Sequence, residues 1–303
     1  MFVRVLGSAA GGGFPQWNTN VGLNRAWHEG TTRASPRTQS SIAVSADGRH
    51  WLLVNASPDV RQQILDFPAL RPAPDTRGTG IAAILLMDSQ IDHTAGLTIL
   101  REGEPLTVWS TRPVYEDLTT GLPLFNVLAH YCGVDWHEID TAGGEFTMAG
   151  VPGLRFDTVE LSSAAPPYSP HRGDSHPGDN IGLIVTDETT GGRLFYAPGL
   201  GAPDDELAAV ARDADCLLVD GTFFTETEMI DQGVGTKTAA SMGHLPQSGE
   251  HGMLAWLGRF PDTRRVLIHI NNTNPILDPD SPERATVERA GVEVAFDGME
   301  IPL

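Results

Sequence analysis

Short runs rich in Val, Ile, Leu and Phe recur along the chain, and each is bounded by Gly, Pro, Asn or Asp. This pattern predicts β-strands buried on both faces. The Asp47-Gly48 pair divides one long β-rich stretch and is typical of a hairpin turn. The strands expected are 2–7, two within 40–57, then 81–86, 106–110, 154–161, 180–186, 193–197, 216–221, 265–270 and 292–296.

Amphipathic stretches separate many of these strands and predict helices. They lie at 58–65, 94–101, 112–131 in two pieces, 203–212, 225–233, 249–258 and 282–290. No linker-like segment divides the chain, so a single domain spanning 1–303 is expected. Apolar strands followed by helices favour an α/β fold of four layers, in which two sheets pack face to face with helices outside.

Composition narrows the class of protein. The chain has 303 residues, 40% of them hydrophobic, and a formal net charge of −19. That charge argues against nucleic acid as a partner, because phosphate binding needs a basic surface. No apolar run reaches membrane-spanning length and no signal-peptide core opens the chain, so we expect a cytoplasmic protein without a membrane partner. Cys132 and Cys216 form no CxxC motif and are expected to be buried, reduced thiols.

Candidate chemistry gathers where predicted strands end. The stretch "ILLMDSQIDHTAGL" (84–97) ends an apolar run in Asp88, and then brings Asp92 beside His93. Further polar residues, Asp220, His244 and His269, also follow or end apolar runs. Two histidines and one carboxylate, with positions left open, suit Fe(II) and O₂ chemistry. The same trio also suits a single zinc ion with a bound water.

At these residues the sequence resembles the metallo-β-lactamase superfamily, whose signature is HxHxDH after a buried strand. Longer blocks resemble one of its members, the coenzyme PQQ synthesis protein B (PqqB) family, nearly end to end. They include "LGSAAGGGFPQWN", "RTQSSIAVS", "DSQIDHTAGL", "GVGTKT" and "IHINNTNPIL". The resemblance implies a metallo-β-lactamase-like αββα sandwich.

The chain departs from the superfamily pattern in an informative way. Asp88 and Gln90 stand where the signature has its two leading histidines. One metal subsite is therefore expected to be lost, and the other to keep Asp92, His93 and His269, with Asp88 or Asp220 as a fourth ligand. In many PqqB proteins cysteines follow "FPQWN" and resemble a structural zinc site. Here "TNVGLNRAW" (19–27) has none, so we expect no zinc there and a more mobile segment.

Each candidate also has a plainer interpretation. Asp92 could cap a helix, and His269 could be a core histidine at a strand end. His244 could act as an acid–base group, support another residue or be purely structural. Asp220 could bind metal, fix an imidazole or shape a turn.

Three loop features carry further hypotheses. The asparagines of "NNTNP", Asn271, Asn272 and Asn274, could orient a substrate, although Asn-Pro turns are common without function. His171 and His176 lie among Pro and Gly and are expected to be solvated or part of a lid. The triglycine 11–13 lacks the spacing of nucleotide-binding loops, which favours a tight turn near the site.

The resemblance implies a role in the synthesis of pyrroloquinoline quinone (PQQ). The family is viewed as an iron-dependent hydroxylase acting on the tyrosine ring of a Glu-Tyr precursor, which makes Fe(II) the expected metal and O₂ the co-substrate. Asp220 and His244 are the expected catalytic proton acceptors. Other PQQ biosynthesis proteins are candidate partners. The alternatives are a mononuclear zinc hydrolase and a non-catalytic carrier that transports PQQ or its precursor.

Overall fold

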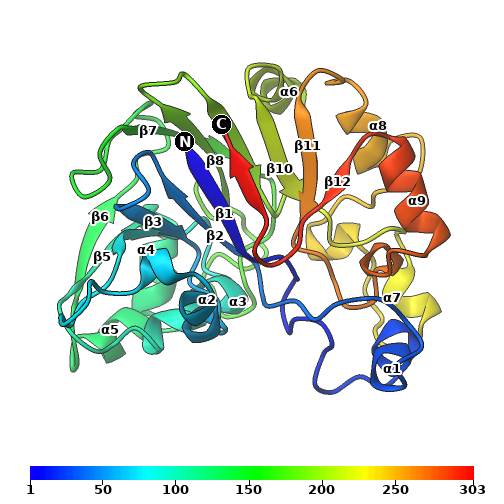
Figure 1. Cartoon of the computed structure of the whole chain (residues 1–303), viewed down its shortest axis with the longest axis horizontal. Helices are drawn as coiled ribbons and strands as arrows, with labels where there is room; N and C mark the ends of the chain where they lie inside the picture. The colour runs from blue at the N-terminus through cyan, green and yellow to red at the C-terminus, as the bar shows by residue number, and fades with distance from the viewer.

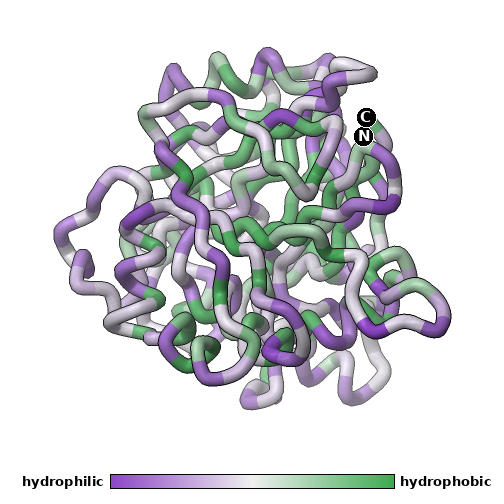
Figure 2. The backbone as a smooth tube through the Cα atoms, turned by 90° about the vertical axis from the view of Figure 1, so that its left-hand side faces the viewer, coloured by the Kyte–Doolittle hydropathy of each residue, from purple (hydrophilic) through white to green (hydrophobic).

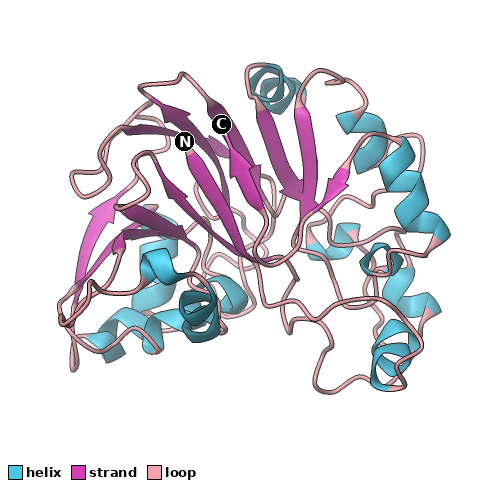
Figure 3. Ribbon diagram, viewed as in Figure 1, coloured by secondary structure: helices cyan, strands magenta, loops and turns pink.

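Two β-sheets form the centre of the protein, as a computed structural model describing all 303 residues shows (Figures 1 and 3). The first sheet has the order β13-β1-β2-β3-β4-β5-β6. Its neighbours are antiparallel from β13 to β3 and parallel from β3 to β6. Its strands are β1 Phe2–Gly7, β2 Ser41–Ser45, β3 Trp51–Val54, β4 Ile81–Leu85, β5 Leu106–Ser110, β6 Val134–Glu138 and β13 Glu300–Pro302.

The second sheet has the order β12-β11-β10-β9-β8-β7. Strands β12 to β9 are parallel, and β8 and β7 continue the sheet in antiparallel fashion. Its strands are β7 Leu154–Glu160, β8 Ile181–Asp187, β9 Arg193–Ala197, β10 Cys216–Asp220, β11 Arg264–Ile268 and β12 Glu293–Val294. The parallel strands matter most for function, because their carboxyl ends open into the loops that hold the polar candidates.

Helices cover the outer faces of both sheets (Figure 3). Those after strands of the first sheet are α2 Val60–Asp66, α3 Ile91–Thr94, α4 Arg112–Thr119 and α5 Leu124–Leu128. Those on the other side are α1 Gly22–His28, α6 Asp205–Arg212, α7 Glu228–Asp231, α8 Met253–Leu257 and α9 Pro282–Arg289. Four 3₁₀ turns complete the set at Pro68–Leu70, Ala95–Thr98, Ala240–Met242 and Pro275–Leu277.

Alternating side chains explain why the strand sequences are almost wholly apolar. In β10, Leu218 faces the core between the sheets while its neighbour Leu217 faces the helix layer. In β4, Leu85 and Ile84 divide in the same way between the central core and the outer core of the first sheet. Side chains of a strand alternate between faces, so a strand covered on both sides must be apolar throughout. Figure 2 shows the hydrophobic stretches running through the interior.

The expected αββα arrangement is confirmed, and most expected strands occur within a residue or two of their predicted bounds. The prediction missed α1, the edge strand β6, the short β13 and three of the 3₁₀ turns. Several helices were predicted too long. The expected helix 94–101 is the α3 turn followed by a 3₁₀ turn, and 225–233 reduces to α7. These segments lack a sustained apolar period, and tertiary packing decides where they end.

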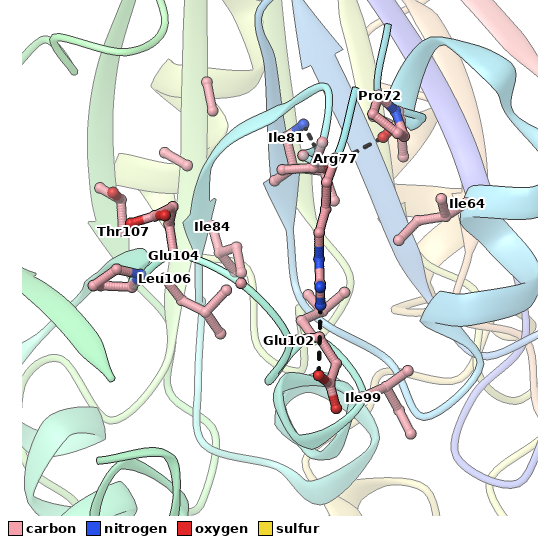
Figure 4. Close-up of a pocket in the computed structure, with 18 residues that line it drawn as sticks. Ile64, Pro72, Arg77, Ile81, Ile84, Ile99, Glu102, Glu104, Leu106 and Thr107 are labelled. Carbon is pink, nitrogen blue, oxygen red and sulfur yellow. Dashed lines mark hydrogen bonds and ion pairs between the residues drawn. The ribbon is translucent and has the colours of Figure 1, made fainter. Parts of the chain in front are cut away.

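A cavity lies on the helix-covered side of the first sheet, beneath the segment 72–80 (Figure 4). Its volume is about 640 Å³, and Ile84 and Leu106 are among its apolar wall residues. Arg77 and Glu102 face one another across it, with Nη2 and Oε2 3.7 Å apart. None of the expected site residues lines it. No helix of the structure combines the length and apolar character needed to cross a bilayer.

Candidate metal centre

Three expected ligands meet where the carboxyl ends of the two sheets converge. Asp92 and His93 lie on α3, just beyond β4, and His269 directly follows β11. Oδ2 of Asp92 is 3.4 Å from Nε2 of His269 and 3.9 Å from Nε2 of His93. One ligand atom from each residue lies within 4.8 Å of the others. The trio expected from the sequence is thus brought together from segments 177 residues apart.

Asp88 lies behind His93 instead of among the clustered ligand atoms. Its Oδ1 and Oδ2 are 2.8 and 2.9 Å from Nδ1 of His93. The expectation that Asp88 is a fourth ligand is therefore corrected: its carboxylate is occupied by the ring nitrogen that faces away from Asp92. A carboxylate in this position fixes the orientation of the imidazole and increases its basicity toward a metal.

His269 has an unusual backbone, with φ of 61°. Left-handed backbone is uncommon for a residue other than glycine and often marks a functional position. Nδ1 of His269 is 2.9 Å from Oγ1 of Thr222, and the same hydroxyl is 2.9 Å from the carbonyl oxygen of His269. Thr222 therefore contacts both the ring and the backbone that carries it.

Asp220 and His244 form a second buried pair beside the trio. Oδ2 of Asp220 is 2.7 Å from Nδ1 of His244, and Oδ1 accepts hydrogen bonds from the backbone N–H and the hydroxyl of Thr222. Asp220 is fully buried, whereas the side chain of His244 remains 15% exposed. Both oxygens of Asp220 therefore contact protein groups, and its role as a proton acceptor stays a prediction. His244 is the member of the pair that is partly exposed.

The three imidazoles share one arrangement. In each, Nδ1 is held by an oxygen of the protein: from Asp88 for His93, from Thr222 for His269 and from Asp220 for His244. Nε2 of His93 is buried and has no hydrogen-bond partner at all. A buried polar atom without a partner is costly and calls for an explanation. A divalent cation bound between the ligand atoms of Asp92, His93 and His269 would provide that partner, so these residues fit a metal.

The pKa shifts of the centre also favour a bound cation. Burial disfavours protonation of His93, but Asp88 and Asp92 outweigh it and raise the pKa of the imidazole to about 9. Burial likewise disfavours ionisation of Asp92, yet His93 and His269 hold the pKa of its carboxyl below the usual range. For His244 the opposing burial is outweighed by Asp220, which raises its pKa. The centre therefore carries negative charge that attracts a proton or a cation.

The asparagines after His269 belong to the scaffold. Asn274 accepts from the backbone N–H of Ile276 and donates to the carbonyl oxygens of Gly221 and Thr222. The Asn271 amide donates to Oγ1 of Thr273. The Asn272 amide donates to Oε1 of Gln16 and Oδ1 of Asn271, and its own Oδ1 accepts from the Asn24 amide. All three are at least nine-tenths buried. Their side chains thus bind the protein itself, and their expected role in orienting substrate stays a prediction.

The glycine-rich loop after β1 forms one wall of the centre, as the sequence indicated. A Cβ placed on Gly11 would lie 3.2 Å from Oδ2 of Asp92. Gly12 and Gly13 have φ of 92° and 70°, values that favour glycine in this tight turn. Backbone thus lies directly against a ligand carboxylate, a contact that the bare triglycine motif did not reveal.

The loop 162–180 also reaches the centre. The Tyr168 hydroxyl donates to the carbonyl oxygen of Ser89, next to Asp88. His171 is buried, with Nδ1 2.9 Å from Oδ1 of Asp179. The expectation that His171 is solvated is wrong, because the loop folds back on this ion pair. His176 is exposed and stacks on the His171 ring at 4.0 Å.

Neither of the two groups of metal-binding side chains includes a residue of the segment 19–27. It is held in another way: α1 buries Asn24, whose amide donates to Oδ1 of Asn272 at 2.9 Å. The backbone N–H of Gln16 donates to Oδ1 of Asn24 at 2.8 Å. A buried amide network thus fastens this segment next to His269, and its mobility stays a prediction.

Comparison with known proteins gives a consistent result. A family model described as a β-lactamase superfamily domain matches residues 50–270. Coenzyme PQQ synthesis protein B from Pseudomonas putida strain W619 and that from Pseudomonas entomophila strain L48 are each 60% identical over all of both chains.

Solved structures extend the comparison. Zn²⁺-bound PqqB from Methylobacterium extorquens is 40% identical, has a TM-score of 0.89 and is covered completely, as is this chain. A diphosphatase of the PhnP family is 17% identical with a TM-score of 0.68, over 99% of this chain and 96% of that one, and shares the fold alone.

Proposed function

Because the chain belongs to the coenzyme PQQ synthesis protein B family of the β-lactamase superfamily, we propose that it acts in PQQ synthesis as an iron-dependent hydroxylase. Its substrate would be the tyrosine ring of a Glu-Tyr precursor, which other PQQ biosynthesis proteins supply and consume. The observation that carries the proposal is the convergence of one ligand atom each from Asp92, His93 and His269 within 4.8 Å of one another. Two imidazoles and one carboxylate with open positions are typical of Fe(II) oxygenases.

A bound Fe(II) would supply the activation of O₂ that hydroxylation of an aromatic ring requires. The chain provides the ligands: Nε2 of His93, Nε2 of His269 and Oδ2 of Asp92. It also fixes their orientation, through Asp88 on His93 and Thr222 on His269. No cysteine belongs to the cluster. Zinc could occupy the same ligands, but zinc has no redox chemistry.

The reaction also needs a proton acceptor. The ring, O₂, two electrons and two protons give a catechol and water, and a reductant must supply the electrons. His244 is positioned to accept the phenol proton while oxygen is added, because Asp220 holds its Nδ1 and its ring is partly exposed. Asp220 acts through His244 and does not touch the substrate.

The test is reconstitution of the protein with Fe(II) under anaerobic conditions, followed by O₂, a reductant and the dipeptide Glu-Tyr. Mass spectrometry should detect a product heavier by one oxygen atom, and ¹⁸O₂ should label it. The zinc-loaded protein is the matched control and should give none.

Two results would contradict the proposal. Absence of catechol with iron loaded and several reductants tried would favour a carrier for PQQ or its precursor. Cleavage of the dipeptide by the zinc form would favour a hydrolase.

A further inference from the structure

Thr222 lies at the junction of the two histidines that flank the centre. Its Oγ1 is 2.5 Å from Oδ1 of Asp220, 2.9 Å from Nδ1 of His269 and 3.1 Å from Nδ1 of His244. The residue is 2% exposed, so no solvent competes for these contacts. One hydroxyl group therefore has to satisfy three polar partners at once, in addition to the His269 carbonyl oxygen.

The number of hydrogens available for donation determines the direction of each hydrogen bond. A threonine hydroxyl has one hydrogen to donate and two lone pairs that accept. An ionised carboxylate only accepts, and the shortest contact is the one to Asp220, so the hydrogen of Thr222 points there. The lone pairs of Oγ1 then face Nδ1 of His269, which must carry a hydrogen to make a bond. His244 makes its own shorter bond, from Nδ1–H to Oδ2 of Asp220 at 2.7 Å.

The same geometry argues against a second ion at this position. Ligand atoms of Asp220, His244 and His269 lie close enough to one another to suggest a metal group. The hydroxyl of Thr222, however, contacts all three, at 2.5, 3.1 and 2.9 Å. Zinc would need about 2.0–2.2 Å to each nitrogen and oxygen ligand, so an ion bound through Oδ1 and these two Nδ1 atoms would have to displace the hydroxyl.

We propose that Thr222 is a positioning residue that keeps a hydrogen on Nδ1 of His269, so that Nε2 is the ring nitrogen turned toward Asp92 and His93. The proposal rests on the metal-binding role of His269 proposed above. Through Asp220, the same hydroxyl joins His269 to His244 in one continuous chain of hydrogen bonds. A change at the metal-facing ring is therefore transmitted to the residue placed to accept the substrate proton.

The experiment compares wild-type protein with Thr222→Val, which keeps the shape and removes the hydroxyl, and Thr222→Ser, which keeps the hydroxyl. Long-range ¹H–¹⁵N spectra of the metal-free proteins report which ring nitrogen of each histidine carries hydrogen. A titration with Zn²⁺ in competition with a chelating dye gives the metal Kd. Wild type and Thr222→Ser should show His269 protonated on Nδ1. Thr222→Val should lose that form and bind Zn²⁺ about 10–100-fold more weakly.

His93 is the internal control, because Asp88 holds its Nδ1 and its signal should not change in either variant. The proposal is overturned if Nδ1 of wild-type His269 carries no hydrogen, a result that needs no variant to fold. It is also overturned if Thr222→Val keeps the wild-type tautomer and Kd, or if Thr222→Ser behaves like Thr222→Val. These readouts use metal-free or zinc-loaded protein, so a failure to form catechol with iron would refute the hydroxylase proposal and leave this one standing.

Discussion

Both carboxylate oxygens of Asp88 lie within 2.9 Å of Nδ1 of His93, at a position where the superfamily signature has a metal-binding histidine. In this chain the side chain at that position contacts His93, a proposed ligand, from behind. We expect Asp88→Asn to weaken metal binding about 10–100-fold, because a neutral amide leaves the imidazole a poorer ligand. Zn²⁺ titration would measure this. Asp135→Asn, which removes a similar but exposed contact to His137, is the control and should leave Kd unchanged.

The ligand assignment itself predicts loss of the ion when either histidine is removed. His93→Ala deletes the donor whose Nε2 has no other partner. At His269 the matched change is Asn, because asparagine tolerates the left-handed backbone that His269 adopts. Each variant should lose stoichiometric metal, measured by elemental analysis after reconstitution, while its circular dichroism stays that of the wild type. A variant that kept a full equivalent with unchanged coordination spectra would refute the assignment of that residue.

The contact between Gly11 and Asp92 predicts that a single methyl group disturbs the centre. In Gly11→Ala the added Cβ would lie 3.2 Å from Oδ2 of Asp92, so the carboxylate has to shift. We expect weaker metal binding with little change in Tm. Gly199→Ala is the matched control, since a Cβ there meets no atom within 4 Å. Equal metal affinities for the two variants would show that the loop does not set the position of Asp92.

The amide network around Asn24 predicts a stable N-terminal segment without metal. Asn24→Ala leaves the N–H of Gln16 and the carbonyl oxygen of the Asn272 side chain unpaired. The cost should be about 1–3 kcal/mol in the free energy of unfolding, measurable by denaturant titration. Asn126→Ala removes an exposed contact to a backbone carbonyl and serves as the control.

A chelator should leave amide protection of residues 19–27 unchanged in wild-type protein. Detection of tightly bound zinc in that segment would contradict this expectation.

Glu228 predicts a loss of stability as pH rises. Burial raises the pKa of its carboxyl from 4.5 to about 7, despite hydrogen bonds from Thr273 and the backbone of Phe224 that favour the charged form. Between these two values the folded state binds more protons than the unfolded state, so the free energy of unfolding falls with increasing pH. The full decrease in the free energy of unfolding is about 3 kcal/mol. It is absent below pH 4.5 and complete above pH 7.

Glu228→Gln should remove this contribution, because an amide can donate to Thr273 and accept from Phe224 as the protonated acid does. Urea titrations at pH 5 and pH 8 should then differ less than in wild type. Glu250→Gln, at an exposed position, should show the wild-type difference. A wild-type protein equally stable at both pH values would rule out the raised pKa.

The sequence predicts the layers of this fold well, because strands such as β4 and β10 are apolar on both faces and leave little ambiguity. It also identifies Asp92, His93 and His269 as one candidate group, through the retained Asp-His pair and a histidine at a strand end. It does not predict Thr222 or the support given by Asp88. Those roles depend on contacts between the ends of β10 and β11 and the loop around His244. These segments are far apart in the sequence, so local sequence patterns do not predict the contacts.

The ligands of the centre come from both halves of the sandwich: Asp92 and His93 follow a strand of the first sheet, and His269 follows a strand of the second. An ion shared by them cross-links the two layers along the edge where they converge. By thermodynamic reciprocity, whatever loosens the packing between the layers weakens ion binding by the same free energy, and the bound ion resists their separation equally. At a hundredfold excess over its Kd an ion would add about 2.7 kcal/mol to the stability of the folded chain. Amide exchange should then slow on both sides of the sandwich together, including in strands that touch no ligand.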